Sequence, residues 1–282
     1  MAATYGPPRL SPTSPSTLGA TVRLGTSVSA KQPLTDADAV GADLVQIHLS
    51  APRNWKDPVG RDDAAELAAS GRVGAVHAPY LVNPASATAS VREKSWHCLQ
   101  VELDACATVA AGGLVVHAGQ AGVDGTIDEA IERWVKDVAV LTGDVPLLIE
   151  NTASGNAAPG RHLDDWIALV EAVRAEARVP IGVCLDTCHA FAGDPAAAAD
   201  PTGWVSTVRE RLGGIDLLHV NDSAVEAGGG RDNHAALGDG EMGDALAAMV
   251  VAAEAPAALL ETPGDDDRRR RDLDWLRSVV SG

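Results

Sequence analysis

The feature that most constrains the fold is an alternation of short apolar runs with longer alanine-rich stretches. Eight runs of strand-forming residues recur along the chain, and stretches rich in Ala, Glu, Arg and Leu, which favour helix, separate them. Strands that alternate with helices predict a parallel sheet, because each helical crossover returns the chain to the same end of the sheet. The predicted strands are 21–27, 44–49, 73–80, 113–117, 146–151, 181–186, 216–220 and 258–261.

The number of units bears on how the sheet is arranged. Its strands are apolar throughout, which indicates burial on both faces. Eight units in 282 residues favour a single-domain α/β fold, the closed (β/α)8 or TIM barrel, although the count also fits an open doubly wound sheet. The stretch 221–242 is a long Gly-, His- and Asp-rich loop, of the kind that is usually functional. Predicted helices lie at 62–69, 91–111, 127–141, 163–177, 202–212 and 243–253.

Several features bear on where the protein acts. No apolar run reaches the roughly 20 residues of a membrane span. Residues 1–18 are rich in Pro, Ser and Thr and lack the apolar core of a signal peptide, so we expect a disordered lead before a barrel domain over 19–282. Cys184 and Cys188 are better explained as small buried residues than as zinc ligands. We expect a cytoplasmic monomer with no obligate protein partner.

Metal-ligand side chains gather at the predicted strand ends. In a barrel, the carboxyl ends of all strands meet at one face, where active sites of this fold are built. A single histidine there is more often a hydrogen-bonded loop residue, and a single carboxylate is usually a helix cap. The joint pattern is what points to metal, and only His48, His97 and His162 fall outside it. The set comprises His77, His117, Glu150, Asp186, His189, His219, Asp232, His234 and Glu261.

The size of this set indicates more than one ion. A zinc ion takes about four nitrogen or oxygen ligands, and a catalytic site leaves one position open for water. Nine ligands therefore suit three zinc ions if one carboxylate bridges two of them. We expect Glu150 to be the bridge, because ligands flank its strand on both sides. Paired metals stabilise the attacking and leaving oxygens of a phosphoryl displacement, so the cluster predicts phosphodiester hydrolysis.

The motifs around these ligands resemble endonuclease IV, the zinc-dependent apurinic/apyrimidinic endonuclease of base-excision repair. The resemblance covers roughly residues 20–280. It is most specific in GVCLDTCHAFAGD (182–194) and in HVNDS (219–223) followed by an acidic residue and a histidine. The other matching stretches are HAPYLVN (77–83), VVHAG (115–119), LLIENTA (147–153), DNH (232–234) and LLETP (259–263).

The resemblance implies how the ligands are shared and what they do. It implies three zinc ions per chain, with Mn2+ as an alternative at one site. It also implies hydrolysis of the phosphodiester 5′ to an abasic site in damaged double-stranded DNA, which leaves a 3′-hydroxyl and a 5′-deoxyribose phosphate. Glu150 and Glu261 would be catalytic. The first zinc would be held by His77, His117 and Glu150, the second by Glu150, Asp186, His219 and Glu261, and the third by His189, Asp232 and His234.

The resemblance further implies contacts to DNA. Arg53, Tyr80 and Leu81 stand where the family inserts side chains into the base stack, and such wedges hold open a kinked duplex. On the residues alone, Tyr80 and Leu81 would be ordinary rim packing. The chain departs from the family pattern at Ala118 and Gln120 after the strand-four histidine. Asn233 stands where the family carries arginine, and the net charge of −17 also opposes DNA binding.

Two other functions fit part of the pattern. Glu150, Asp186, His219 and Glu261 alone would form the single-metal set of a sugar isomerase or epimerase on the same fold. Such an enzyme has no need of the five remaining ligands, which favours the nuclease. A protein that binds metal or DNA without catalysis is the other alternative, and the complete ligand set argues against it.

Overall fold

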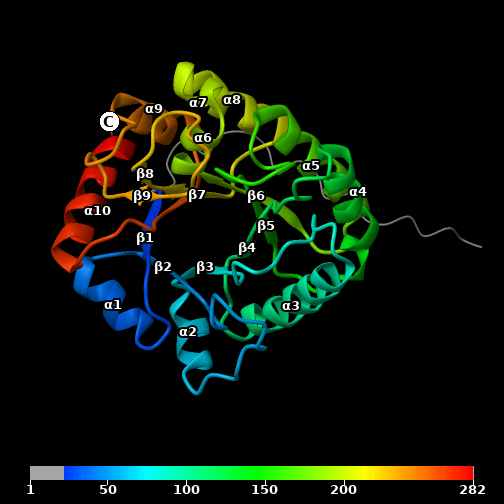
Figure 1. Cartoon of the computed structure of the whole chain (residues 1–282). Coiled ribbons are helices and arrows are strands. Elements are labelled where there is room, and N and C mark those ends of the chain that lie inside the picture. The colour runs from blue at the N-terminus through cyan, green and yellow to red at the C-terminus, as the bar shows by residue number, and fades with distance from the viewer. Residues whose placement is uncertain (1–21, 282) are drawn as a thin grey trace, which may run out of the picture.

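The strands close into a parallel barrel. In this computed structural model, which describes residues 22–281, the strands form a ring with helices outside it, as Figure 1 shows. The ring closes because β1 pairs in parallel with both β2 and β10. This confirms the predicted (β/α)8 barrel. Its strands are β1 (Arg23–Ser27), β2 (Leu44–Ile47), β3 (Val73–His77), β4 (Leu114–His117), β5 (Leu147–Glu150), β6 (Ile181–Asp186), β7 (Leu217–Val220) and β10 (Ala257–Leu260).

The helices form the outer layer and include several that the sequence did not predict. Those that match predictions are α2 (Ala64–Ser70), α3 (Ala89–Thr108), α4 (Ile127–Asp137) with the short 3-10 turn η1 (Val138–Val140), α5 (Leu163–Glu176), α8 (Pro201–Leu212) and α9 (Asp244–Ala253). The unpredicted ones are α1 (Pro33–Val40), α6 (Thr187–Gly193), α7 (Pro195–Ala199) and α10 (Asp266–Ser281). No helix within 22–281 combines the length and apolar character that crossing a membrane requires. The predicted lead, 1–18, lies outside the described residues.

Two apolar cores support the barrel. The larger core fills the space between strands and helices and includes the fully buried Trp134 and Trp166. The smaller core lies inside the ring and is built from one residue of most strands. It packs closely: a β-carbon on Gly25 would lie 2.3 Å from the Leu44 carbonyl oxygen, so only glycine fits there. Its members are Leu44, Ala75, Val115, Leu148, Cys184, Leu217 and Leu259.

The long loop after β7 is ordered by one buried carboxylate. Within it, β8 (Asp222–Ser223) and β9 (His234–Ala235) pair in an antiparallel hairpin that the sequence did not predict. The Asp222 carboxylate accepts hydrogen bonds from the backbone N–H groups of Gly238, Gly240 and Met242 at 3.0–3.2 Å. These bonds fold the loop back on itself and fix the hairpin that carries His234.

We predict that Asp222→Ala lowers the free energy of unfolding by about 3 kcal/mol, because it leaves several loop N–H groups without their charged acceptor. Asp274→Ala is the matched control, since its carboxylate is 73% exposed and, among the described residues, pairs with Arg277 alone. That control should cost less than about 1 kcal/mol. Chemical denaturation of both variants checks this, and equal losses would contradict the role of Asp222.

Candidate metal centre

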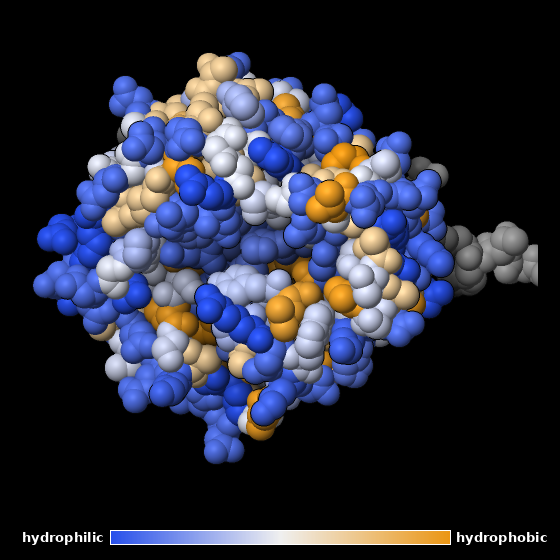
Figure 2. All heavy atoms as spheres, viewed as in Figure 1, coloured by the Kyte–Doolittle hydropathy of each residue, from blue (hydrophilic) through white to orange (hydrophobic). Residues whose placement is uncertain are grey.

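The metal-ligand side chains gather at the carboxyl end of the barrel. Figure 2 shows this region as a hollowed, mainly hydrophilic centre with small separate hydrophobic groups around it. A cavity of about 420 Å³ opens there. The ligand atoms form three groups within which every pair lies within 4.8 Å. They are His77 with His117 and Glu150; Glu150 with Asp186, His219 and Glu261; and His189 with Asp232 and His234.

The first group places two imidazoles on one carboxylate oxygen. The Nε2 atoms of His77 and His117 each lie 3.2 Å from Glu150 Oε2. His77 Nδ1 donates to the Ala78 carbonyl oxygen at 2.8 Å. The proton on Nδ1 leaves the lone pair on Nε2, facing the group, which is how a second hydrogen bond fixes the tautomer of a metal-ligating histidine.

Glu150 also belongs to the second group, to which it contributes its other oxygen, Oε1. His219 Nδ1 lies 2.8 Å from Glu150 Oε1 and 3.3 Å from Glu261 Oε2. On the far side of the ring, His219 Nε2 is 2.9 Å from Gln46 Oε1, an acceptor, so Nε2 carries the proton and Nδ1 faces the carboxylates. Asp186 completes the group, with its Oδ2 4.0 Å from His219 Nδ1.

The third group converges on Asp232. The Nε2 atoms of His189 and His234 each lie 3.2 Å from Asp232 Oδ1. Neither buried Nε2 makes a well-formed hydrogen bond to any residue within 22–281. His189 Nδ1 donates to the Asn151 carbonyl oxygen at 3.0 Å, which again directs the Nε2 lone pair into the group. Two unpartnered imidazole nitrogens and a carboxylate that face one point suit a bound cation.

The buried carboxylates of the cluster also require nearby positive charge. Burial opposes ionisation of Glu150, but His219 and His117 outweigh it and hold the pKa of Glu150 well below its usual range. Burial opposes protonation of His234, but the nearby negative charge of Asp232 prevails and raises the pKa of His234 to about 9. Without metal, protons on histidines therefore balance the buried carboxylates. Zinc ions would supply the same compensation, so the donor set fits zinc.

Two cysteines lie closer to the cluster than the sequence indicated. Cys184 Sγ is within 4.8 Å of ligand atoms of Glu150 and His219, and Cys188 Sγ is equally near Asp186 and His234. Both cysteines are buried, as expected. Burial raises the pKa of the Cys184 thiol to about 12 and also raises the pKa of Cys188. Burial thus favours the neutral thiol in the absence of metal, whereas the thiolate is the ligating form.

Sequence reasoning missed the side chains that orient the ligands. Gln46 is fully buried on β2 and also donates through Nε2 to Glu261 Oε1. Asn221 donates to Asp186 Oδ2 at 2.6 Å, and Asn151 holds the Asp186 backbone at both N–H and C=O. His48 Nδ1 donates to the His77 carbonyl oxygen at 2.9 Å. A polar residue inside an apolar strand run, as at Gln46, was the available signal.

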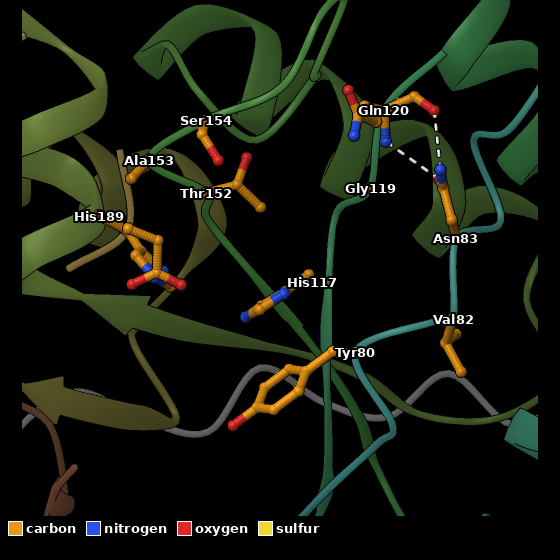
Figure 3. A pocket seen from close by; sticks show the side chains of 11 residues that line it. Tyr80, Val82, Asn83, His117, Gly119, Gln120, Thr152, Ala153, Ser154 and His189 are labelled. Atoms are coloured by element: carbon orange, nitrogen blue, oxygen red, sulfur yellow. Dashed lines mark hydrogen bonds and ion pairs between the residues drawn. The ribbon is translucent and has the colours of Figure 1, made fainter. Parts of the chain in front are cut away.

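The remaining predicted residues lie on the rim. Tyr80 is 53% exposed and Leu81 37% exposed, so both present apolar surface to solvent. Figure 3 shows the Tyr80 and His117 side chains pointing into one pocket beside the cluster. Tyr80 N–H donates to the Pro52 carbonyl oxygen at 2.9 Å, which ties Tyr80 to the exposed loop of Arg53. His97 and His162, which fall outside the ligand pattern, are exposed.

Comparison with known proteins identifies the family to which the sequence is similar. A family model described as xylose isomerase-like TIM barrel matches residues 34–279. A probable endonuclease 4 of Mycobacterium marinum is 42% identical over 259 residues, which are 92% of this chain and 99% of that relative. A probable endonuclease 4 of Mycobacterium tuberculosis is 43% identical over 255 residues, covering 90% of this chain and 97% of the relative.

Solved structures of other proteins show the same barrel fold. Endonuclease IV of Thermus thermophilus is 29% identical with a TM-score of 0.77, and the match covers 92% of this chain and 99% of that one. A D-psicose 3-epimerase is 16% identical with a TM-score of 0.61, over 92% of this chain and 100% of the epimerase. At that identity the likeness extends to the fold alone.

We predict that Gln46→Leu weakens zinc binding by the second group about 10- to 100-fold, because His219 and Glu261 lose the partner that orients them. Gln32→Leu, at an exposed position before α1, is the control and should bind zinc as the wild type does. Competition with a chromogenic chelator measures the affinity. Wild-type affinity in Gln46→Leu would show that Gln46 does not position the ligands.

Proposed function

The chain belongs to the endonuclease IV family, and we propose that it hydrolyses the phosphodiester 5′ to abasic sites in duplex DNA with three bound zinc ions. The products would be a 3′-hydroxyl and a 5′-deoxyribose phosphate. In this proposal, the three ligand groups described above each hold one zinc ion. The complete ligand set supports it, because a single-metal epimerase has no use for a third group at Asp232.

The position of Glu150 is the observation that carries the proposal. Its Oε2 faces the imidazoles of His77 and His117, whereas its Oε1 faces His219. One carboxylate thus offers a separate oxygen to each of two neighbouring groups. Glu150 is fully buried, and this fixes the arrangement. A bridging carboxylate holds two cations close together, as in-line displacement at phosphorus requires.

The residues of the chain contribute position and charge to this reaction. When bound, the zinc ions would polarise the phosphodiester and activate water for attack. The proposed catalytic residues, Glu150 and Glu261, hold the negative charge that keeps those cations in place. Gln46 and Asn221 bind Glu261 from two sides and limit its movement. Preorganised charge of this kind avoids reorganisation during the reaction.

Contacts to DNA would come from the rim. Tyr80 and Leu81 expose apolar surface beside the cavity, which suits side chains that wedge into an opened base stack. Arg53 stands on the loop bonded to Tyr80 and is exposed, so it can reach a phosphate or a base edge. A missing base lowers the cost of extruding a nucleotide and favours abasic sites as substrate.

The direct test is incubation of the zinc-loaded protein with a duplex that carries one synthetic abasic site. We expect a single cut 5′ to the site, and none after treatment with a chelator, because the cluster supplies the catalytic charge. Gel electrophoresis with end-labelled strands identifies both termini. An intact duplex at full zinc loading would refute the proposal. Ketose interconversion instead would support the epimerase alternative.

We predict that Glu150→Gln abolishes cleavage, with a loss of at least about 1,000-fold, because a neutral amide weakens two neighbouring cation sites at once. Zinc content should fall together with the rate. Glu132→Gln is the matched control, because Glu132 is exposed on α4 and should keep full activity. Near-normal turnover of Glu150→Gln would contradict the bridging role.

A further inference from the structure

Four consecutive arginines, Arg268–Arg271, follow the two aspartates that begin α10, and they have different surroundings. Arg268 binds the Asp239 and Asp272 carboxylates at 2.6 and 2.9 Å. Arg270 pairs with Asp267 and donates to the Ala39 carbonyl oxygen at 2.9 Å. Arg271 is exposed. Arg269 alone among them lines the cavity at the metal centre, within the part of the chain that the structure describes.

The Arg269 guanidinium has unused hydrogen-bonding capacity. Its side chain is 30% exposed. Its one ion pair within residues 22–281 joins Nη1 to Asp266 Oδ1 at 3.3 Å, and the Asp266 side chain is 55% exposed. Its buried Nε has no hydrogen-bond partner among residues 22–281. A half-exposed pair of this kind is weak, so an incoming anion can compete for the guanidinium.

The charges around the cavity indicate what this anion is. Apart from Arg269, the charged or ionisable groups that line it are proposed metal ligands or Tyr80. No lysine and no other arginine within 22–281 lines the cavity, and the residue between Asp232 and His234 is the neutral Asn233. The net charge of −17 repels a polyanion from the molecule as a whole, so attraction must come from local cations.

We propose that Arg269 binds a backbone phosphate of the DNA substrate beside the metal centre. This inference rests on the proposed function. The planar guanidinium holds several N–H donors in a fixed fork that matches phosphate oxygens, an arrangement that lysine cannot reproduce. Arg269 would position the strand and contribute to affinity, while the hydrolytic step stays with the cluster. No bond is formed or broken at this residue.

The test compares Arg269→Gln with Arg271→Gln, a neighbouring exposed arginine, on the zinc-loaded protein. We expect KM for the abasic duplex to rise about tenfold in Arg269→Gln, with kcat within about twofold, because a charge-assisted phosphate contact is lost. The dependence of log KM on log salt concentration should become shallower by about 0.9, as expected for one lost phosphate contact. Arg271→Gln should match the wild type. Arg269→Lys should recover the salt dependence, and part of the affinity.

Anisotropy measurements of binding to the same duplex separate this inference from the proposed function. An affinity loss and a shallower salt dependence in Arg269→Gln support the phosphate contact even if the wild type cleaves nothing, in which case only the nuclease proposal fails. Wild-type affinity and salt dependence in Arg269→Gln would overturn the inference. A fall in zinc content or melting temperature, with the salt dependence unchanged, would also overturn it, because it would indicate a structural role.

Discussion

The structure depends on the compensation of carboxylates that are buried at the mouth of the barrel. Glu150 and Asp186 are fully buried, and Glu261 lies beside them against His219. Such groups are costly to bury unless positive charge and hydrogen bonds surround them. Protonated histidines supply both in the absence of metal, and the ring nitrogens that face the carboxylates are the ones that would bind a cation once they lose their protons. The same arrangement that costs stability in an empty site attracts divalent cations.

The barrel makes this concentration of charge feasible. Parallel strands bring side chains that are far apart in sequence to one end, and the close-packed interior core below them gives that end a rigid floor. At the carboxyl ends of the strands, the neutral amides of Gln46, Asn151 and Asn221 hold the ligands in place. Asp222 extends this order to the loop that carries Asp232 and His234 of the third group. Core packing, hydrogen bonds and loop structure therefore together position the metal-ligand side chains.

The sequence predicts the strands well, because the apolar runs are short, are separated by helix-forming stretches and mostly end in ligand residues. It does not predict α10, whose first turns are almost entirely charged and whose buried contacts reduce to Asp272, Leu273 and Leu276. It does not predict α6 either, since Asp186 both caps that helix and faces the cluster. Gln46, Cys184 and Arg269 were missed because strand register and helix rotation, rather than residue type, decide which side chains face the cavity.

The central claim is that three cations are shared among nine side chains through one bridging carboxylate. Metal analysis of the purified protein, after exhaustive exchange into metal-free buffer and reloading with zinc, tests this most directly. The account predicts about three tightly bound zinc ions per wild-type chain and about two in Asp232→Asn, which removes the carboxylate at the centre of the third group. A single bound ion in the wild type would contradict it.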